Sequence, residues 1–112
     1  MSVLFSKNQD VMIAIPNGRL DTSNSPEAEQ GLMEHVDAGE LKIVMDFAKT
    51  EYISSAGLRV LLKTAKVLKS KGGDIALCHA NEQIAEVLQI SGFNALINCY
   101  DSLEEAIESV SA

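Results

Sequence analysis

The segment 41–47 constrains the fold of this chain more than any other part of its sequence. It is apolar at every position except Lys42 and Asp46. An apolar run of this length without alternation is typical of a strand that is buried on both faces, as in a parallel sheet. Parallel strands are joined by long crossovers, usually helices. We therefore expect a helix after this strand and a parallel strand beyond the helix.

The predicted crossover helix covers residues 56–71 and is the longest helix that the sequence indicates. Its apolar side chains recur at helical spacing, which predicts one stripe packed against the core. The stripe consists of Leu58, Leu61, Leu62, Ala65 and Leu68. Gly72 and Gly73 follow the last turn and end the helix. We expect residues 41–47 to form a central strand and the stripe to be mostly buried.

The alternation of strand and helix patterns continues on both sides of this unit. Further strands are expected at residues 3–5, 11–15, 74–78 and 95–100, with Arg19 and Leu20 resuming the second after a turn. Further helices are expected from Asn24 to about Gly39, from Asn81 to Gly92, and from Ser102 onward. The first and last of these helices begin with the spacing of a capping box, Asn24 with Glu27 and Ser102 with Glu105.

This order of elements predicts the fold class. Strands separated by single helices indicate right-handed crossovers and a parallel core. The sequence therefore predicts an α/β fold with the order ββαβαβαβα in one domain over residues 1–112. We expect a mixed, mostly parallel sheet of about five strands and four helices mostly on one side.

Size and charge limit the class of protein. With 112 residues and 46% hydrophobic residues, the chain is long enough to bury a core. Its 16 acidic and 9 basic residues give a net charge of −7, which disfavours nucleic-acid binding because phosphate repels such a surface. No apolar run approaches the roughly 20 residues that cross a bilayer, and no basic segment precedes an apolar stretch at the N-terminus. We therefore expect a cytoplasmic protein without membrane insertion.

Residue patterns typical of enzymes are scarce. The two histidines are His35, within a predicted helix, and His79, at the end of a predicted strand. Adjacent residues of a strand project to opposite faces, so Cys78 and His79 are not expected to form a nucleophile–base pair. The sequence contains no glycine-rich phosphate loop and no cluster with metal-ligand spacing. We therefore expect no catalytic activity, no metal site and no cofactor.

The two cysteines and Asp46 have structural interpretations. Cys78 and Cys99 stand singly in apolar segments, which predicts two reduced, buried thiols. Asp46 ends the strand 41–47, where a receiver domain places its phosphoacceptor. That chemistry needs further carboxylates to hold magnesium, and the segment 6–8 at the end of the first strand is Ser-Lys-Asn instead. Asp46 is therefore expected to accept hydrogen bonds from backbone amides of the following loop.

The most informative stretch of the sequence is 46–62. An aspartate ends the apolar strand, a loop of seven or eight residues follows, and Ser-Ser-Ala-Gly-Leu at residues 54–58 opens the leucine-rich helix. This pattern resembles the signature of the STAS family (sulfate transporter and anti-sigma factor antagonist). The turn Gly-Arg-Leu-Asp at residues 18–21 is similar to the turn that precedes the first helix in that family. Together with the order of elements, the resemblance extends over essentially the whole chain.

The resemblance implies a phosphorylation site. In bacterial members of the family, a serine two residues before the motif glycine is phosphorylated by an anti-sigma factor that is itself a serine kinase. The matching residue here is Ser55. Many members have aspartate immediately before this serine, whereas this chain has Ser54, so Ser54 remains the lesser candidate.

The same resemblance implies a partner-switching function. The unphosphorylated protein would bind the anti-sigma factor serine kinase, phosphorylation of Ser55 would release it, and a serine phosphatase would restore binding. The alternative is a STAS adaptor subunit of a transport or lipid-trafficking complex whose serine is never modified. The residues implied in partner binding surround the serine and continue along the helix: Asp21, Ser54, Ala56, Gly57, Arg59 and Lys63.

Two features of the helix 56–71 have a structural and a functional interpretation. A serine at a helix N-terminus is exposed where backbone amides favour a phosphate, yet Ser54 or Ser55 can also serve only as a cap worth about 1 kcal/mol. Arg59, Lys63 and Lys66 lie at positions i, i+4 and i+7. They form either a solvated face or a basic edge that steers an acidic partner.

Overall fold

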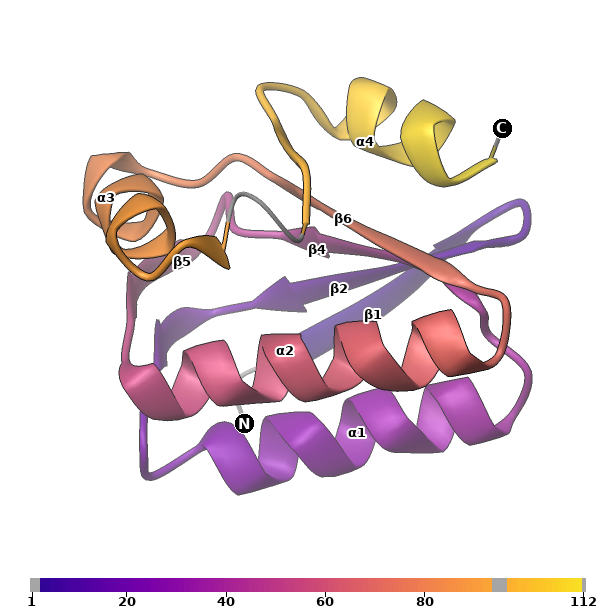
Figure 1. Cartoon of the computed structure of the whole chain (residues 1–112), viewed down its shortest axis with the longest axis horizontal. Coiled ribbons are helices and arrows are strands. Elements are labelled where there is room, and N and C mark those ends of the chain that lie inside the picture. Colours follow the sequence, from indigo (N-terminus) through magenta and orange to yellow (C-terminus); the bar gives the residue numbers. More distant parts are fainter. Residues whose placement is uncertain (1–2, 94–96, 112) are drawn as a thin grey trace.

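A five-stranded sheet forms the centre of the molecule (Figure 1). The structure, a computed structural model, describes residues 3–93 and 97–111. In spatial order, the strands are β1 (Val3–Asn8), β2 (Val11–Pro16), β4 (Lys42–Asp46), β6 (Asp74–Cys78) and β7 (Cys99–Tyr100). β1 pairs antiparallel with β2, and all other neighbours in this sheet are parallel. The predicted mixed, mostly parallel sheet is therefore confirmed, with β4 at its centre.

Four helices cover the sheet in the described part of the chain. They are α1 (Ser25–Asp37), α2 (Ser55–Ser70), α3 (Glu82–Ile90) and α4 (Leu103–Ser111). α1 and α2 pack side by side on one face, and α4 packs on β4 and β6 from the opposite face (Figure 1). None of these helices combines the length and the apolar character needed to span a bilayer. α3 contributes Ile84 and Leu88 to the same core as α1 and α2, so three of these four helices lie on one side, and the expected order of elements is confirmed.

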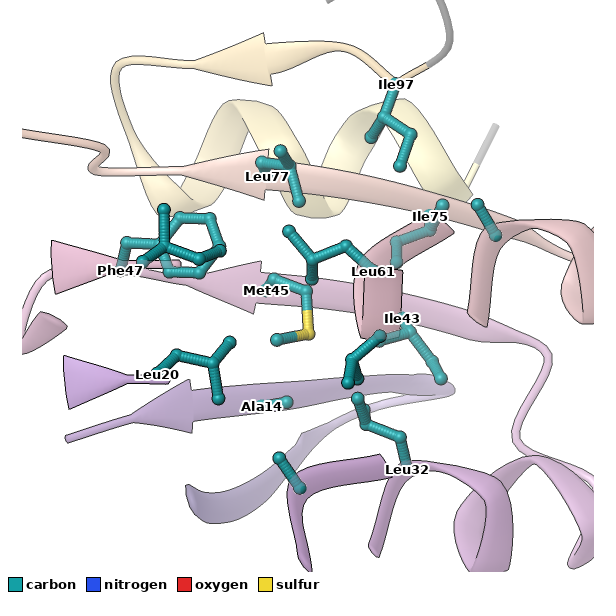
Figure 2. Packing of buried hydrophobic residues seen from close by; sticks show 14 of the residues in the cluster. Ala14, Leu20, Leu32, Ile43, Met45, Phe47, Leu61, Ile75, Leu77 and Ile97 are labelled. Carbon is teal, nitrogen blue, oxygen red and sulfur yellow. The ribbon is translucent and has the colours of Figure 1, made fainter. Parts of the chain in front are cut away.

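The central strand β4 is buried on both faces, as its apolar run predicts. Ile43 and Met45 point into the larger core beneath α1 and α2, whereas Val44 points into the smaller core beneath α4. All three side chains are at most 1% exposed. Figure 2 shows Ile43 and Met45 packed together with Leu61 of α2. The two-sided burial explains why this strand lacks polar alternation.

The leucine stripe of α2 faces the same core. Leu61, Ala65 and Leu68 are buried, and Leu58 and Leu62 are partly buried against the cluster. The helix begins one residue earlier and ends one residue earlier than predicted. The prediction of a mostly buried stripe is confirmed.

Two short strands lie outside the main sheet. β3 (Gly18–Leu20) and β5 (Thr50–Ile53) form a separate parallel pair. The sequence predicted a loop for the segment that contains β5. The strand was not recognised because it has only four residues. Thr50 is nevertheless buried, and its hydroxyl donates to the Pro16 carbonyl at 2.6 Å. This pair connects the turn before α1 to the segment that leads into α2.

The last strand differs from its prediction. Of the expected strand 95–100, residues 95 and 96 lie outside the described residues, and β7 consists of Cys99 and Tyr100 alone. Both cysteines are free, and Cys78 is buried as predicted, but Cys99 is exposed. The predicted burial of Cys99 is wrong because β7 is a two-residue edge strand, paired with β6 on one side.

The two predicted capping boxes also differ. The Ser102 hydroxyl accepts from the Glu105 amide at 3.2 Å and donates to the Glu105 carboxylate at the same distance, which confirms that cap. Asn24 occupies the N-cap position of α1, but its side chain makes no capping bond. It instead accepts from the Asp21 amide and donates to the Arg19 carbonyl. The side chain of Asn24 therefore stabilises the turn before α1 rather than the helix itself.

Candidate functional site

The two adjacent serines at the start of α2 have different environments. Ser54 is the N-cap in an extended backbone conformation, and its hydroxyl oxygen accepts from the Gly57 amide at 3.4 Å. Ser55 is the first residue of the helix and is exposed. Within the described part of the chain, its hydroxyl makes no hydrogen bond to the protein. The structure thus assigns the capping position to Ser54 and leaves the Ser55 hydroxyl accessible.

Gly57 fixes how the strand β3 approaches this helix. A Cβ atom at Gly57 would lie 2.8 Å from both the Leu20 carbonyl oxygen and the Ile53 Cγ1 atom. The Leu20 carbonyl also accepts from the Ser54 amide at 2.9 Å. A side chain at position 57 would therefore push the end of β3 away from the helix start. This close approach gives a physical reason for glycine three residues after the N-cap.

Asp21 directly follows β3 and lies beside this contact in the chain. Its Oδ1 atom accepts from the Ser23 amide at 3.0 Å and from the Ser23 hydroxyl at 2.7 Å. These bonds, led by the one from the Ser23 hydroxyl, hold the pKa of the Asp21 carboxyl below its usual range. The Arg19 side chain lies 3.5 Å from Oδ2 of Asp21, and its guanidinium lies 4.5 Å from the centre of the Tyr52 ring. Asp21 is therefore a fixed negative charge at the end of β3.

Two shallow grooves run between α1 and α2 from this point. The first, of about 370 Å³, is lined by Thr22, Ser25, Pro26, Glu29, Ala56, Arg59 and Val60. The second, of about 450 Å³, shares Glu29 and Arg59 with the first and adds Leu62, Lys63, Lys66 and Val67. Lys63 contacts Glu29 across the helices at 2.8 Å. The grooves are lined by apolar side chains together with the basic residues Arg59, Lys63 and Lys66 and the acidic Glu29.

All sequence-predicted site residues except Lys63 thus lie around the N-terminal end of α2. Ala56 and Arg59 line the first groove, while Gly57 is buried and contributes backbone only. Lys63 lies farther along the helix, where Glu29 already pairs with it. Arg59 is exposed at the groove that begins beside Ser55.

A second cluster lies at the carboxyl ends of β4 and β6. The Oδ1 atom of Asp46 accepts from the Ala48 amide at 2.9 Å, as predicted, and also lies 2.8 Å from Nδ1 of His79. The same nitrogen lies 3.8 Å from the Cys78 sulfur. Burial, with help from Asp46, raises the pKa of the Cys78 thiol to about 12. The thiol is therefore protonated at neutral pH and a poor nucleophile.

This contact corrects the expectation that Cys78 and His79 point apart. β6 ends at Cys78, and His79 adopts a left-handed backbone conformation with φ of 60°. The alternation rule of a strand does not apply beyond its end, so the imidazole turns back toward Asp46 and Cys78. A signal for the cluster was present in the sequence, since Asp46 and His79 both lie at the carboxyl ends of predicted parallel strands.

A cavity of about 580 Å³ opens beside this cluster. Its lining residues come from the loop after β4, the segment after β6, α3 and the region of β7: Ala48, His79, Ala80, Ala85, Cys99, Tyr100 and Asp101. The loop after β6 leads to α3, and the loop after β7 leads to α4 on the other face of the sheet (Figure 1). The cavity thus lies outside the carboxyl ends of the parallel strands, the edge of the sheet at which ligands of open α/β folds bind.

Comparison with known proteins assigns the family. The family model of the STAS domain matches residues 3–106 of this chain. The chain therefore belongs to the STAS domain family.

Relatives across most of the chain carry a common name. The Bordetella bronchiseptica protein BtrV, described as a candidate anti-sigma factor antagonist, is 37% identical over 106 residues, which cover 95% of this chain and 91% of BtrV. A solved structure of a candidate anti-sigma factor antagonist from Thermotoga maritima has a TM-score of 0.93 at 28% identity and covers 98% of this chain and 95% of its own.

More distant structures share the fold. The anti-sigma factor antagonist SpoIIAA in its unphosphorylated form has a TM-score of 0.84 at 19% identity, over 98% of this chain and 96% of its own. Its phosphorylated form, from Bacillus, has a TM-score of 0.76 at 19% identity, over 97% of this chain and 99% of its own.

Proposed function

We propose that this STAS protein is an anti-sigma factor antagonist that binds an anti-sigma factor serine kinase when Ser55 is unmodified and releases it when Ser55 is phosphorylated. A serine phosphatase then restores binding. The observation that carries the proposal is the exposure of Ser55 in the first turn of α2. The names of the relatives and the existence of a phosphorylated form of SpoIIAA support it.

Geometry favours Ser55 over Ser54 as the phosphoacceptor. A kinase must bring its catalytic base and the γ-phosphate of ATP in line with the attacking hydroxyl. Ser54 is half-buried and its hydroxyl caps the helix, whereas Ser55 is exposed. Phosphorylation of Ser54 would first require the loss of that cap. Ser55 is therefore the better substrate.

The fold tolerates a phosphate at Ser55, but a partner packed over it does not. The amides of the first turn of α2 and the helix dipole favour a negative charge there. A partner that covers the helix start would instead bury a charge of about −1.5 to −2. Leaving a charge buried and unpaired in an interface costs several kcal/mol. The phosphate therefore acts on binding rather than on folding.

The groove next to Ser55 supplies the remaining contacts of the proposed interface. Asp21, Ser54 and Ala56 border the helix start, Gly57 keeps the β3 end close, and the exposed Arg59 lies on the groove. Lys63 extends a basic edge along α2, although Glu29 already pairs with it. A basic edge on a chain of net charge −7 suits a partner with an acidic contact surface.

In this scheme the chain is a substrate and has no catalytic role of its own. ATP and magnesium are bound by the kinase. Residues 1–112 act as one STAS unit in the cytoplasm. The high pKa of the Cys78 thiol beside His79 is consistent with this role, because a protonated thiol is a weak nucleophile.

The test is phosphate mapping with matched serine variants. Wild type, Ser54→Ala and Ser55→Ala are incubated with the anti-sigma factor kinase of the same organism and ATP, and phosphate is located by mass spectrometry. We expect label in wild type and Ser54→Ala and none in Ser55→Ala. Label that survives in Ser55→Ala and disappears in Ser54→Ala would move the site to Ser54. Absence of label from all three proteins would favour the alternative, an unmodified STAS adaptor subunit of a transport or lipid-trafficking complex.

A further inference from the structure

We propose that Asp46, Cys78 and His79 form a binding site for a thiophilic divalent metal ion of the Zn²⁺ class. The three residues offer one carboxylate oxygen, one sulfur and one imidazole nitrogen, and these atoms all lie within 4.8 Å of one another. This donor set is one that Zn²⁺ uses in proteins. The site is separate from Ser55 and does not depend on the proposed function.

The distances between donor atoms suit a tetrahedral ion. Zinc bonds of about 2.3 Å to sulfur and about 2.0 to 2.2 Å to nitrogen and oxygen place neighbouring ligand atoms about 3.4 to 3.6 Å apart. The observed separations are 3.8 Å from the Cys78 sulfur to Nδ1 of His79 and 2.8 Å from that nitrogen to Oδ1 of Asp46. The nitrogen–oxygen pair must open by about 0.6 Å and the sulfur–nitrogen pair close by about 0.2 Å to reach these values, and the Cys78 sulfur lies within 4.8 Å of the Asp46 carboxylate oxygen.

The strands hold the donors in place without a metal. Asp46 and Cys78 are direct register partners on the neighbouring parallel strands β4 and β6. The Phe47 amide donates to the Cys78 carbonyl at 2.9 Å, which continues the pairing to the strand ends. The left-handed backbone at His79 then brings its ring back over the two strand ends. The site is therefore preorganised by the sheet, and binding need not order a loop.

Charge balance favours a divalent ion at this depth. Asp46 is 7% exposed and Cys78 is fully buried. On binding, the Cys78 thiol releases its proton to solvent and the sulfur bonds to the metal, while the neutral His79 carries its proton on Nε2 and bonds through Nδ1. One carboxylate and one thiolate then neutralise the two positive charges. A neutral complex avoids the cost of leaving a net charge in a buried site.

Of the three donors, His79 alone lines the adjacent cavity of about 580 Å³, and its side chain is 36% exposed. His79 is therefore the donor on the solvent side of the proposed site, where water can complete the coordination of the ion. The thiolate favours Zn²⁺ over Mg²⁺ and Ca²⁺, which prefer oxygen ligands.

Cobalt and zinc titrations test this site directly. The full chain, stripped of metal by a chelator and kept reduced with a phosphine, is titrated with Co²⁺. We expect a thiolate-to-cobalt charge-transfer band and the visible bands of a tetrahedral site, saturating at about one equivalent. Zn²⁺ then displaces Co²⁺ and abolishes both signals.

Matched variants assign the ligands. Cys78→Ala is expected to abolish the charge-transfer band, whereas Cys99→Ala, which changes the other thiol near the cavity, retains it. His79→Asn preserves a residue type that tolerates the left-handed backbone. His79→Asn and Asp46→Asn should each lower Zn²⁺ affinity at least about 100-fold. This is the upper end of the loss, about 10- to 100-fold, seen when a residue that only hydrogen-bonds to a metal ligand is removed. Circular dichroism and thermal unfolding show whether each variant remains folded.

Several results would overturn the proposal. The proposal is overturned if the wild type shows no charge-transfer band at stoichiometric Co²⁺. It is also overturned if the band persists in Cys78→Ala and disappears in Cys99→Ala. If Cys78→Ala fails to fold, unchanged Zn²⁺ affinity in both His79→Asn and Asp46→Asn overturns it. Phosphate mapping at Ser55 is unaffected by any of these outcomes, so the two proposals fail separately.

Discussion

The start of α2 and the carboxyl ends of β4 and β6 accommodate negative charge in opposite ways. At the start of α2, Ser55 is exposed and helix amides favour an added anion. At the strand ends, Asp46 is buried and depends on fixed partners, the Ala48 amide and His79. We therefore expect a charge added at Ser55 to leave the fold intact, whereas loss of the Asp46 carboxylate should destabilise it.

The difference assigns each region the kind of event it can support. A covalent modification by another protein needs an exposed hydroxyl, and α2 provides one. A metal ion needs several donors held at fixed separations, and the adjacent parallel strands provide them.

Gly57→Ala is expected to give the largest effect on stability. Gly→Ala inside an exposed helix usually stabilises, but here the new Cβ would lie 2.8 Å from the Leu20 carbonyl and from Ile53. We expect a loss of about 2 to 3 kcal/mol in the free energy of unfolding, the upper part of the range for overpacked sites, because one of the two clashes is with backbone. Denaturant unfolding measures it, with Ser55→Ala in the same turn as the control. A stabilised Gly57→Ala would show that β3 does not pack tightly against α2.

Removal of the buried carboxylate should have the next largest effect. Asp46→Ala leaves the Ala48 amide and Nδ1 of His79 without their partner. The removed carboxylate is 7% exposed and both lost bonds are partly buried, so we expect a loss of about 1 to 2 kcal/mol, the range for hydrogen bonds to a partly buried charged group. The matched variant Asp21→Ala removes a surface carboxylate. Because water can take its place as the hydrogen-bond partner of Ser23, the unfolding midpoint of this variant should barely change. Equal effects of the two variants would remove the contrast between the regions.

The two serines should differ by a smaller amount. Ser54→Ala removes the cap of α2, and its bond of 3.4 Å is long. We therefore expect a loss of about 0.5 to 1 kcal/mol, the lower part of the range for N-caps. Ser55→Ala should change stability by less than about 0.5 kcal/mol, as other surface substitutions do. Thermal unfolding of both variants measures the difference, and a larger loss in Ser55→Ala would reverse the assignment of the cap.

The smallest effect concerns the carboxyl of Asp21. Because hydrogen bonds led by the Ser23 hydroxyl hold its pKa below the usual value, its contribution to stability is present above that value and is lost as pH falls through the lowered pKa. Ser23→Ala should raise the pKa of Asp21 toward the ordinary range. An NMR titration of the carboxyl carbon measures this, with Asp37, an exposed aspartate at the end of α1, as an internal reference. An unchanged Asp21 titration would assign the shift to other donors.

The local geometry at the start of α2 follows from the sequence far more directly than the cluster at the ends of β4 and β6 does. The Ser-Ser-Ala-Gly-Leu motif is contiguous, and helical spacing alone places its first turn beside a loop. The strand β5 was missed because it has only four residues, too few for an alternation of apolar and polar side chains to be recognised. The burial of Cys99 was mispredicted because β7 has two residues and lies at the edge of the sheet, with a neighbouring strand on one side. The cluster at Asp46 depends on strand register and on a single left-handed residue, His79, neither of which sequence periodicity specifies.

We expect a charge at Ser55 to change partner binding and to leave the fold intact. The affinities of the unmodified and the Ser55-phosphorylated protein for the anti-sigma factor kinase, with the thermal stability of both forms measured in parallel, decide this. We expect phosphorylation to weaken binding by about 100-fold or more, equivalent to about 2.7 kcal/mol, while the unfolding midpoint shifts by no more than a few degrees. Equal affinity of the two forms, or loss of the folded state on phosphorylation, would rule out the proposed switch.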